Sequence, residues 1–311
     1  MSGPARAAPP AAARTGVRRL RIALGAAAVL AVAGWAVVMP RPLPDDAFDG
    51  VAGDAARGEE VFWAGGCASC HAAADATGEA RLILAGGQAF ASPFGTFYAP
   101  NISSDVEAGI GAWTVQDLGN AMLRGVSPSG QHYYPAFPFA SYSKATLQDV
   151  ADLRAYLATL PASAAPSQPH DLPFPFNIRL ALGAWKLLFL TSDWTVTGDL
   201  TPEEARGRYL AEALGHCGEC HTPRNLLGAM LRDRWLAGGP TPDGKGKVPN
   251  ITPAKLSWSQ ADIVEYLTSG FTPDYDSAGG HMALVVRNTA MLPPADRAAI
   301  AAYLARVPPV E

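Results

Sequence analysis

The sequence predicts a mainly α-helical protein in which two similar domains follow one another behind an N-terminal transmembrane helix. Three observations support this fold class. An uncharged run from Ile22 to Met39 lies near the N-terminus, and several short motifs occur twice in the same order. The 31 glycines and 27 prolines among 311 residues favour helices separated by irregular loops over continuous sheet.

The N-terminal segment divides into a leader and an apolar span. Residues 1–19 form an arginine-containing leader, and residues 20–39 approach the ~20 residues that cross a bilayer. Arginines precede the span and acids follow it, so the positive-inside rule leaves the leader in the cytoplasm and places the body outside. A cleaved signal peptide is the alternative, because Ala31-Val32-Ala33 has the small-x-small form of a cleavage site. Both interpretations deliver the body to the periplasm.

All four cysteines belong to two copies of one motif, Cys67-Ala-Ser-Cys70-His71 and Cys217-Gly-Glu-Cys220-His221. This spacing attaches a c-type haem, because the two thiols bond the vinyl groups and the adjoining histidine becomes an axial iron ligand. The alternatives are two redox dithiols, two disulfides or one four-cysteine zinc site. A dithiol does not need the histidine. Paired zinc knuckles lie about 15–20 residues apart, whereas 146 residues separate these motifs.

The sequence therefore predicts two covalently bound haem c groups. Cys67 and Cys70 attach one, Cys217 and Cys220 attach the other, and the axial ligands that adjoin them are His71 and His221. Bacteria attach such haems outside the inner membrane, in agreement with the predicted orientation.

The two motifs lie in two similar halves, which we interpret as domains over residues 50–161 and 201–311. Each half has a helical lead-in, the cysteine motif, a Gly-Gly pair, a Pro-Asn-Ile motif, a tryptophan four residues before an aspartate, and a closing helix with a Tyr-Leu pair. Residues 162–200 form a proline-rich linker. It is interrupted by an apolar interdomain helix within Asn177 to Leu190, for which docking onto a partner subunit or the membrane surface is the alternative role.

The charge distribution argues against one class of partner. Every charged residue before Asp45 is an arginine, and from Asp45 onward the net charge is −10. An acidic body argues against nucleic acid and permits electrostatic steering toward a basic redox partner. An effect on solubility alone explains the charge equally well.

The order of helix, haem motif, loops and closing helix resembles class I cytochrome c, here as two domains in tandem. The chain also resembles the multihaem cytochrome c subunits of bacterial membrane-bound dehydrogenases for alcohols and gluconate, from about Ala55 to the end. Those subunits commonly carry three haem motifs and this chain has two, so the resemblance implies a diheme branch. The residues that carry it are Phe94-Gly95-Thr96, Asn101-Ile102, Gly109-Ile110-Gly111, Trp113, Gly125-Val126, His132-Tyr133-Tyr134-Pro135-Ala136, Arg206-Gly207-Arg208-Tyr209-Leu210 and Gly215-His216-Cys217 to Arg224-Asn225.

The resemblance also implies a second axial ligand for the C-terminal haem. The family's methionine loop corresponds here to Gly279-Gly280-His281-Met282, between the helix after Trp258 and the closing helix. Met282 is the expected ligand, ahead of Met291, His281 and Met230.

The corresponding loop of the first half departs from the family. The family's Tyr-Pro-Ala-Met-Pro reads Tyr134-Pro135-Ala136-Phe137-Pro138 here, and phenylalanine cannot bind iron. His132 is the expected replacement ligand. Met122, or an open five-coordinate iron, are the alternatives.

These features predict a membrane-anchored periplasmic diheme cytochrome c on the bacterial inner membrane, attached by a single span. It would carry electrons from a periplasmic dehydrogenase or a quinol to an oxidase or a soluble cytochrome. The alternative is a diheme enzyme, either a peroxidase or a sulfur-compound oxidoreductase, with substrate bound at the first haem.

Overall fold

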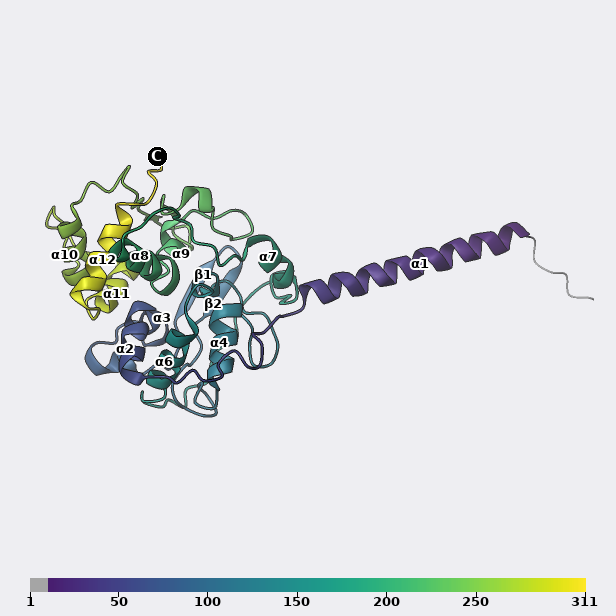
Figure 1. Cartoon of the computed structure of the whole chain (residues 1–311). Helices are drawn as coiled ribbons and strands as arrows, with labels where there is room; N and C mark the ends of the chain where they lie inside the picture. The colour runs from purple at the N-terminus through teal and green to yellow at the C-terminus, as the bar shows by residue number, and fades with distance from the viewer. Residues whose placement is uncertain (1–10) are drawn as a thin grey trace, which may run out of the picture.

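The structure is a computed structural model that describes residues 11–311, with side chains from residue 19 onward. Helix α1 (Ala11–Val38) projects away from the rest of the chain (Figure 1). Its segment Arg19–Val38 is long and apolar enough to cross a membrane, and none of it is buried against the body. The helix ends two residues before Pro40, whose ring cannot continue it. Residues 1–10 of the predicted leader lie outside the described residues.

The first half of the body alternates short helices with loops and one small hairpin. Strands β1 and β2 pair antiparallel, with Ala89 opposite Tyr98. The elements are α2 (Ala55–Ala64), α3 (Cys67–His71), η1 (Gly78–Leu82), β1 (Ala89–Ser92), β2 (Gly95–Tyr98), α4 (Val115–Arg124), α5 (Phe139–Tyr142) and α6 (Leu147–Leu157).

The second half has a comparable order of elements. Strands β3 and β4 again pair antiparallel, with Gly239 opposite Val248. The elements are α8 (Pro202–Tyr209), the π-helical turn η2 (Leu210–Leu214), α9 (Gly218–His221), η3 (Arg232–Arg234), β3 (Gly239–Pro240), β4 (Lys247–Val248), α10 (Gln260–Ser269), α11 (Gly280–Thr289) and α12 (Pro294–Leu304).

Corresponding helices begin and end for the same local reasons. Helix α4 starts with a capping box, in which Thr114 and Asp117 satisfy each other's backbone N–H groups, and it ends at left-handed Gly125. Helix α10 starts with the same box on Ser259 and ends at left-handed Gly270. The repeat recognised in the sequence is therefore also a repeat of local backbone structure.

Each half is built on a close crossing of two helices. In α2, a Cβ at Gly58 would lie 2.0 Å from the Asp152 carbonyl oxygen of α6. In α8, a Cβ at Gly207 would lie 1.8 Å from the Ala299 carbonyl oxygen of α12. Only glycine permits so close an approach, because it has no side chain to displace the opposite backbone.

An arginine fastens each crossing beside its glycine. Arg57 donates from Nε and Nη2 to the Asp152 carboxylate at 2.8 and 3.0 Å, and Arg206 donates in the same way to Asp296 at 2.9 and 2.6 Å. Paired bonds of this kind fix orientation as well as distance. The Arg-Gly dipeptide is thus the contact unit of the crossing in both halves.

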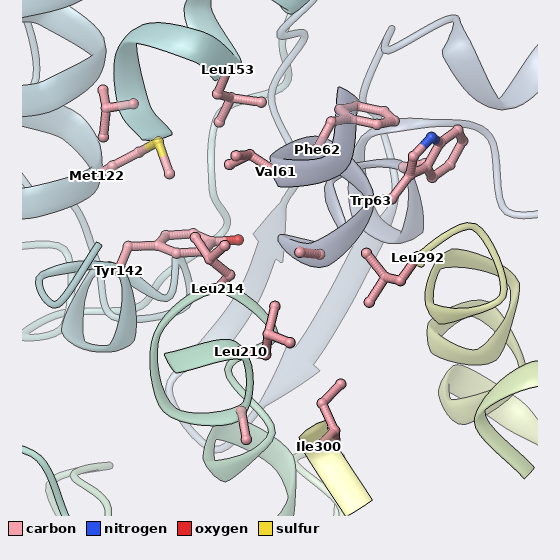
Figure 2. Packing of buried hydrophobic residues seen from close by; sticks show 14 of the residues in the cluster. Val61, Phe62, Trp63, Met122, Tyr142, Leu153, Leu210, Leu214, Leu292 and Ile300 are labelled. Carbon is pink, nitrogen blue, oxygen red and sulfur yellow. The ribbon is translucent and has the colours of Figure 1, made fainter. Parts of the chain in front are cut away.

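The two halves share one hydrophobic core. Figure 2 shows Phe62 of α2 in the same cluster as Leu210 and Leu214 of η2 and Ile300 of α12. Phe62 and Tyr303 are among the largest fully buried side chains, one from each half. The second half therefore packs directly against the first.

The predicted interdomain helix is present as α7 (Ala181–Phe189) and contacts three parts of the chain. Trp185 Nε1 donates to the Leu227 carbonyl of the second half at 2.9 Å. Lys186 Nζ donates to the Arg124 carbonyl of the first half at 2.7 Å. A Cβ at Gly183 would lie 2.0 Å from the Val38 carbonyl oxygen, so α7 also lies against the end of α1 (Figure 1).

We expect Gly207→Ala to destabilise the folded protein by about 1–3 kcal/mol, because the added methyl group overpacks the crossing of α8 and α12. Thermal unfolding followed by circular dichroism measures the effect. Gly34→Ala is the matched control, since Gly34 is also helical and a Cβ there meets nothing within 4 Å. Equal loss of stability in both variants would contradict the crossing as the cause.

Candidate haem-binding site

Both cysteine–histidine motifs fold into a single helical turn. In α3, Cys67, Cys70 and His71 lie at positions i, i+3 and i+4, which places their side chains on one face of the helix. The turn is entered through a left-handed residue, Gly66 with φ 65°, and His216 takes the same place before Cys217 with φ 39°. Glycine adopts this conformation without strain, whereas histidine does not.

The two motif histidines are held in the same way. His71 Nδ1 lies 2.8 Å from the Pro100 carbonyl oxygen, and His221 Nδ1 lies 2.9 Å from the Pro249 carbonyl oxygen. A carbonyl can only accept, so Nδ1 carries the proton in both rings and Nε2 is left as the basic nitrogen. Removal from water also lowers the pKa of both imidazoles. Each ring is therefore a neutral, oriented donor, the form that ligates iron.

The asparagine after each proline holds the loop that presents this carbonyl. Asn101 Nδ2 donates to the Ser163 and Ala165 carbonyls at 2.7 and 2.8 Å. Asn250 Nδ2 donates to the Val310 carbonyl at 2.7 Å. The Pro-Asn-Ile motif thus connects each histidine to the segment that follows the closing helix of its half.

The four thiols do not form the alternative sites. All four are free in the structure. Burial raises the pKa of Cys67 and Cys217 to about 12 and of Cys70 to about 11, opposite to the lowered pKa of a reactive dithiol. Within residues 11–311, His, Cys, Asp and Glu side chains do not gather in groups of three or more that could hold a metal ion. The donor set fits a thioether-linked haem in each motif.

The two motifs lie against each other across the boundary between the halves. Cys70 is close enough to Cys220 for that thiol to raise its pKa further. The Gly65 carbonyl, two residues before Cys67, accepts from Tyr142 Oη at 2.8 Å and faces His216 Nε2 at 3.3 Å. The rings of Tyr142 and His216 meet edge to face at 5.5 Å.

Polar contacts extend this boundary on both sides. Ser141 Oγ donates to Glu219, which lies between the cysteines of the second motif, at 3.0 Å. Asn288 of α11 donates to Ser69, between the cysteines of the first motif, at 2.6 Å and accepts from Arg81 at 2.5 Å. Each half thus supplies side chains to the motif of the other.

The backbone identifies which residues correspond in the two distal loops. In the first half, Tyr133 N donates to Gly125 O and Ser127 N donates to Gln131 O, both at 2.8 Å. In the second half, Ala278 N donates to Gly270 O at 2.8 Å and Thr272 N donates to Asp276 O at 2.9 Å. Every one of these residues has its counterpart 145 positions later, so Phe137 corresponds to Met282.

The position of Met282 agrees with the expected ligand set in part. It lies in the first turn of α11, where the family resemblance implied a loop, and it is partly buried against the core. Of the competing residues, Met291 is 52% exposed and His281 is also exposed, stacking on Phe90 at 5.9 Å. Met230 is partly buried in the loop that Trp185 contacts.

The prediction that His132 is an axial ligand is contradicted. Its Nε2 lies 2.8 Å from the Val38 carbonyl oxygen, so the ring faces the last turn of α1. Arg179 donates to the His132 carbonyl at 2.9 Å and holds this segment against α7. His132 therefore caps a helix end and is turned to the anchor. Met122, the other candidate named from sequence, is buried in the core beside Val61 and Leu153 (Figure 2).

A buried carboxylate lies behind the second motif. Glu212 is fully buried and accepts from Thr195 N at 2.6 Å, Val196 N at 3.0 Å and Tyr303 Oη at 2.8 Å. Tyr303 accepts in turn from Trp235, whose ring lies against Gly218 of the motif. Three donors satisfy the charge of Glu212, which the structure needs because an unpaired buried carboxylate is costly.

Sequence reasoning missed Tyr142, His216 and Glu212 as site residues. For His216 a signal existed, because a histidine stands where the first motif has Gly66. Tyr142 and Glu212 carry no such signal, since their partners are distant in sequence.

We expect His132→Ala to leave the visible spectrum of both haems unchanged, because its imidazole is bonded to the Val38 carbonyl. Absorption spectra of the oxidised and reduced variant test this. Met282→Leu is the comparison, since loss of a ligand alters the spectrum. A low-spin haem converted to high spin by His132→Ala would reverse the conclusion drawn from its hydrogen bond.

Comparison with known proteins agrees with this geometry. Residues 55–161 match the family model for cytochrome c. The chain is 61% identical over 295 residues to a protein named "Diheme cytochrome c-type" from Cereibacter sphaeroides, covering 94% of this chain and all of that protein. It is 39% identical over 259 residues to the fructose dehydrogenase cytochrome subunit of Gluconobacter japonicus, covering 81% of this chain and 52% of that subunit.

A third relative is the cytochrome c subunit of the quinone alcohol dehydrogenase of Gluconacetobacter polyoxogenes, 34% identical over 309 residues. That match covers 94% of this chain and 63% of the subunit, so the chain spans about half to two thirds of these dehydrogenase subunits. With full-length similarity to a diheme cytochrome and two oriented cysteine–histidine motifs, this chain belongs to the c-type cytochromes related to the cytochrome subunits of alcohol, gluconate and fructose dehydrogenases.

Proposed function

We propose that this protein is a membrane-anchored diheme cytochrome c that transfers electrons within a periplasmic dehydrogenase chain. One observation carries the proposal: two motifs, each with an oriented neutral histidine, lie against each other across a shared core. Two tandem class I cytochrome c domains, over residues 50–161 and 201–311, account for the repeated crossings, caps and histidine bonds.

The residues have defined roles in this proposal. Two thioether bonds per haem form at Cys67 and Cys70 and at Cys217 and Cys220, and His71 and His221 supply the proximal nitrogens. Met282 supplies the distal sulfur in the second half. When bound, each haem iron takes up and releases one electron, while the protein sets its potential and exposure.

The boundary between the halves is suited to exchange between two redox groups. Tyr142 is 5% exposed, and it shares the Gly65 carbonyl with His216 of the other half. These contacts keep water out and hold the two motifs at a fixed separation. Little reorganisation then accompanies the movement of charge between them.

The partners follow from the relatives and from charge. Relatives at 32–39% identity are named as cytochrome subunits of fructose, nicotinate, alcohol and gluconate dehydrogenases, which supports a dehydrogenase or a quinol as electron donor. The body from Asp45 onward has a net charge of −10, which favours a basic surface on the acceptor, an oxidase or a soluble cytochrome. Helix α1 anchors the protein in the bacterial inner membrane, with the arginines at Arg18, Arg19 and Arg21 inside and the body in the periplasm.

We expect two covalent haems per chain. A pyridine haemochrome assay should give two for the wild type and one each for Cys70→Ala and Cys220→Ala, because the cysteines lie in separate helical turns. Cys→Ser at the same positions controls for the loss of polarity. A wild-type value of one, or loss of both haems from one substitution, would refute the assignment.

We expect the first haem to have the lower reduction potential, because Phe137 stands where the second half has Met282 and methionine opposite histidine raises the potential. Phe137→Met should bring the two potentials together in a redox titration. It should also strengthen the near-infrared sulfur-to-iron band of the oxidised protein.

The matched test is on the second haem. Met282→Leu should abolish that band in the wild-type background, and Met291→Leu should leave it intact, since Met291 is largely exposed. Loss of the band only in Met291→Leu, or a first haem at or above the potential of the second, would overturn the ligand assignment. Carbon monoxide binding to the reduced wild type would indicate an open first site and support an enzymatic role.

A further inference from the structure

Helix α7 is amphipathic in the reverse sense for a helix on a protein surface. Its exposed positions, together with the residue before it, follow helical spacing and are all apolar. Leu187 is 56% exposed and Leu188 is 70% exposed. We call this face the α7 stripe; its members are Leu180, Ala181, Ala184, Leu187 and Leu188.

The polar and small residues of α7 face the body and prevent the helix from turning over. Lys186 donates to the Arg124 and Gly125 carbonyls, each at 2.7 Å, and its ammonium lies 4.6 Å from the ring centroid of Phe139. Burial lowers the pKa of this lysine to about 8. Gly183 lies directly on the Val38 carbonyl. The α7 stripe is therefore held outward by bonds on the opposite face.

The stripe lies at the level where the candidate membrane span ends. Val38 is the last residue of both α1 and the span Arg19–Val38, and it is the residue that Gly183 contacts. Figure 1 shows α7 at the base of α1, on the side of the body from which the anchor projects. A bilayer crossed by α1 reaches its outer boundary at Val38, and the α7 stripe begins there.

Other exposed apolar side chains continue the stripe on both sides. Phe174, in the segment before α7, is 77% exposed. Leu226 is 97% exposed, and its neighbour Leu227 is tied to α7 by the bond from Trp185. So large an apolar area on a protein surface marks a binding surface.

The charge of this region differs from that of the body. Residues 172–192 contain two cations, Arg179 and Lys186, and no acid, whereas the chain from Asp45 onward has a net charge of −10. Absence of acids is what an anionic lipid headgroup surface requires of a segment lying on it.

We propose that the α7 stripe, with Phe174 and Leu226, rests in the headgroup region of the bilayer that α1 crosses. The proposal rests on the anchor proposed above. A single helix with a loop after it leaves a body free to swing. A second apolar contact beside the helix end fixes one face of the body to the membrane and so fixes which face meets a membrane-bound redox partner.

The test separates the stripe from the anchor. A protease site inserted between Arg41 and Pro42, both exposed, allows α1 to be cut from the body after the full-length protein is reconstituted in vesicles of phosphatidylethanolamine and phosphatidylglycerol. Flotation then measures the haem-containing body that remains on the vesicles. The variants are Leu187→Ser/Leu188→Ser and, as matched control, Val106→Ser/Phe271→Ser, which removes two exposed apolar side chains outside the stripe.

After cleavage, we expect the wild type and the control to stay on the vesicles and the stripe variant to lose binding by about tenfold, since two leucines no longer enter the lipid. Release of all three bodies, or equal retention of all three, overturns the proposal, and equal retention points to the α1–α7 contact alone. Loss of binding to pure lipid vesicles with retention on native membranes assigns the stripe to a protein partner. Extraction of the uncut chain by alkaline carbonate would instead overturn the anchor.

Discussion

The structure depends on two places where a helix backbone touches another helix backbone. Gly58 and Gly207 bring α2 against α6 and α8 against α12 at distances that no side chain allows. Such crossings put the residues that follow the first helix in a fixed relation to the closing helix. The cysteine–histidine turn begins only a few residues after α2 and after η2, so its position is set by the crossing. An arginine beside each glycine adds a directed pair of hydrogen bonds, which resists sliding of one helix along the other.

From this frame, the site is built twice and then joined. Each histidine is oriented by a proline carbonyl, and each proline is oriented by an asparagine bonded to the chain beyond the closing helix. The halves meet through the motifs themselves. His216 adopts a left-handed backbone conformation there, and its ring approaches the Gly65 carbonyl and Tyr142 of the other half. An unfavourable conformation at this point is consistent with a position selected for its contact.

The halves differ where their chemistry should differ. Phe137 and Met282 occupy equivalent positions in loops with the same hydrogen-bond pattern, yet only the second can donate to iron. Behind the second motif, Glu212 contributes a buried negative charge through Tyr303 and Trp235. A buried carboxylate favours the oxidised, more positive state of a nearby iron and opposes the effect of the methionine sulfur. The potential of the second site is therefore a balance between two groups on opposite sides of the motif.

The sequence by itself determined what depends on covalent reach and local periodicity. Two cysteines three apart with a histidine after the second can act only within one helical turn, so the four cysteines and His71 and His221 were identifiable without a fold. The apolar run before Pro40 and the repeated caps are equally local. Only the tertiary structure decided which residues meet across long separations. His132 sits close to Phe137 in sequence, but the end of α1, 94 residues earlier, takes its imidazole. The outward face of α7 is likewise invisible in an apolar run, because which side of a helix faces solvent depends on the Val38 carbonyl and the Arg124 carbonyl that hold the other side.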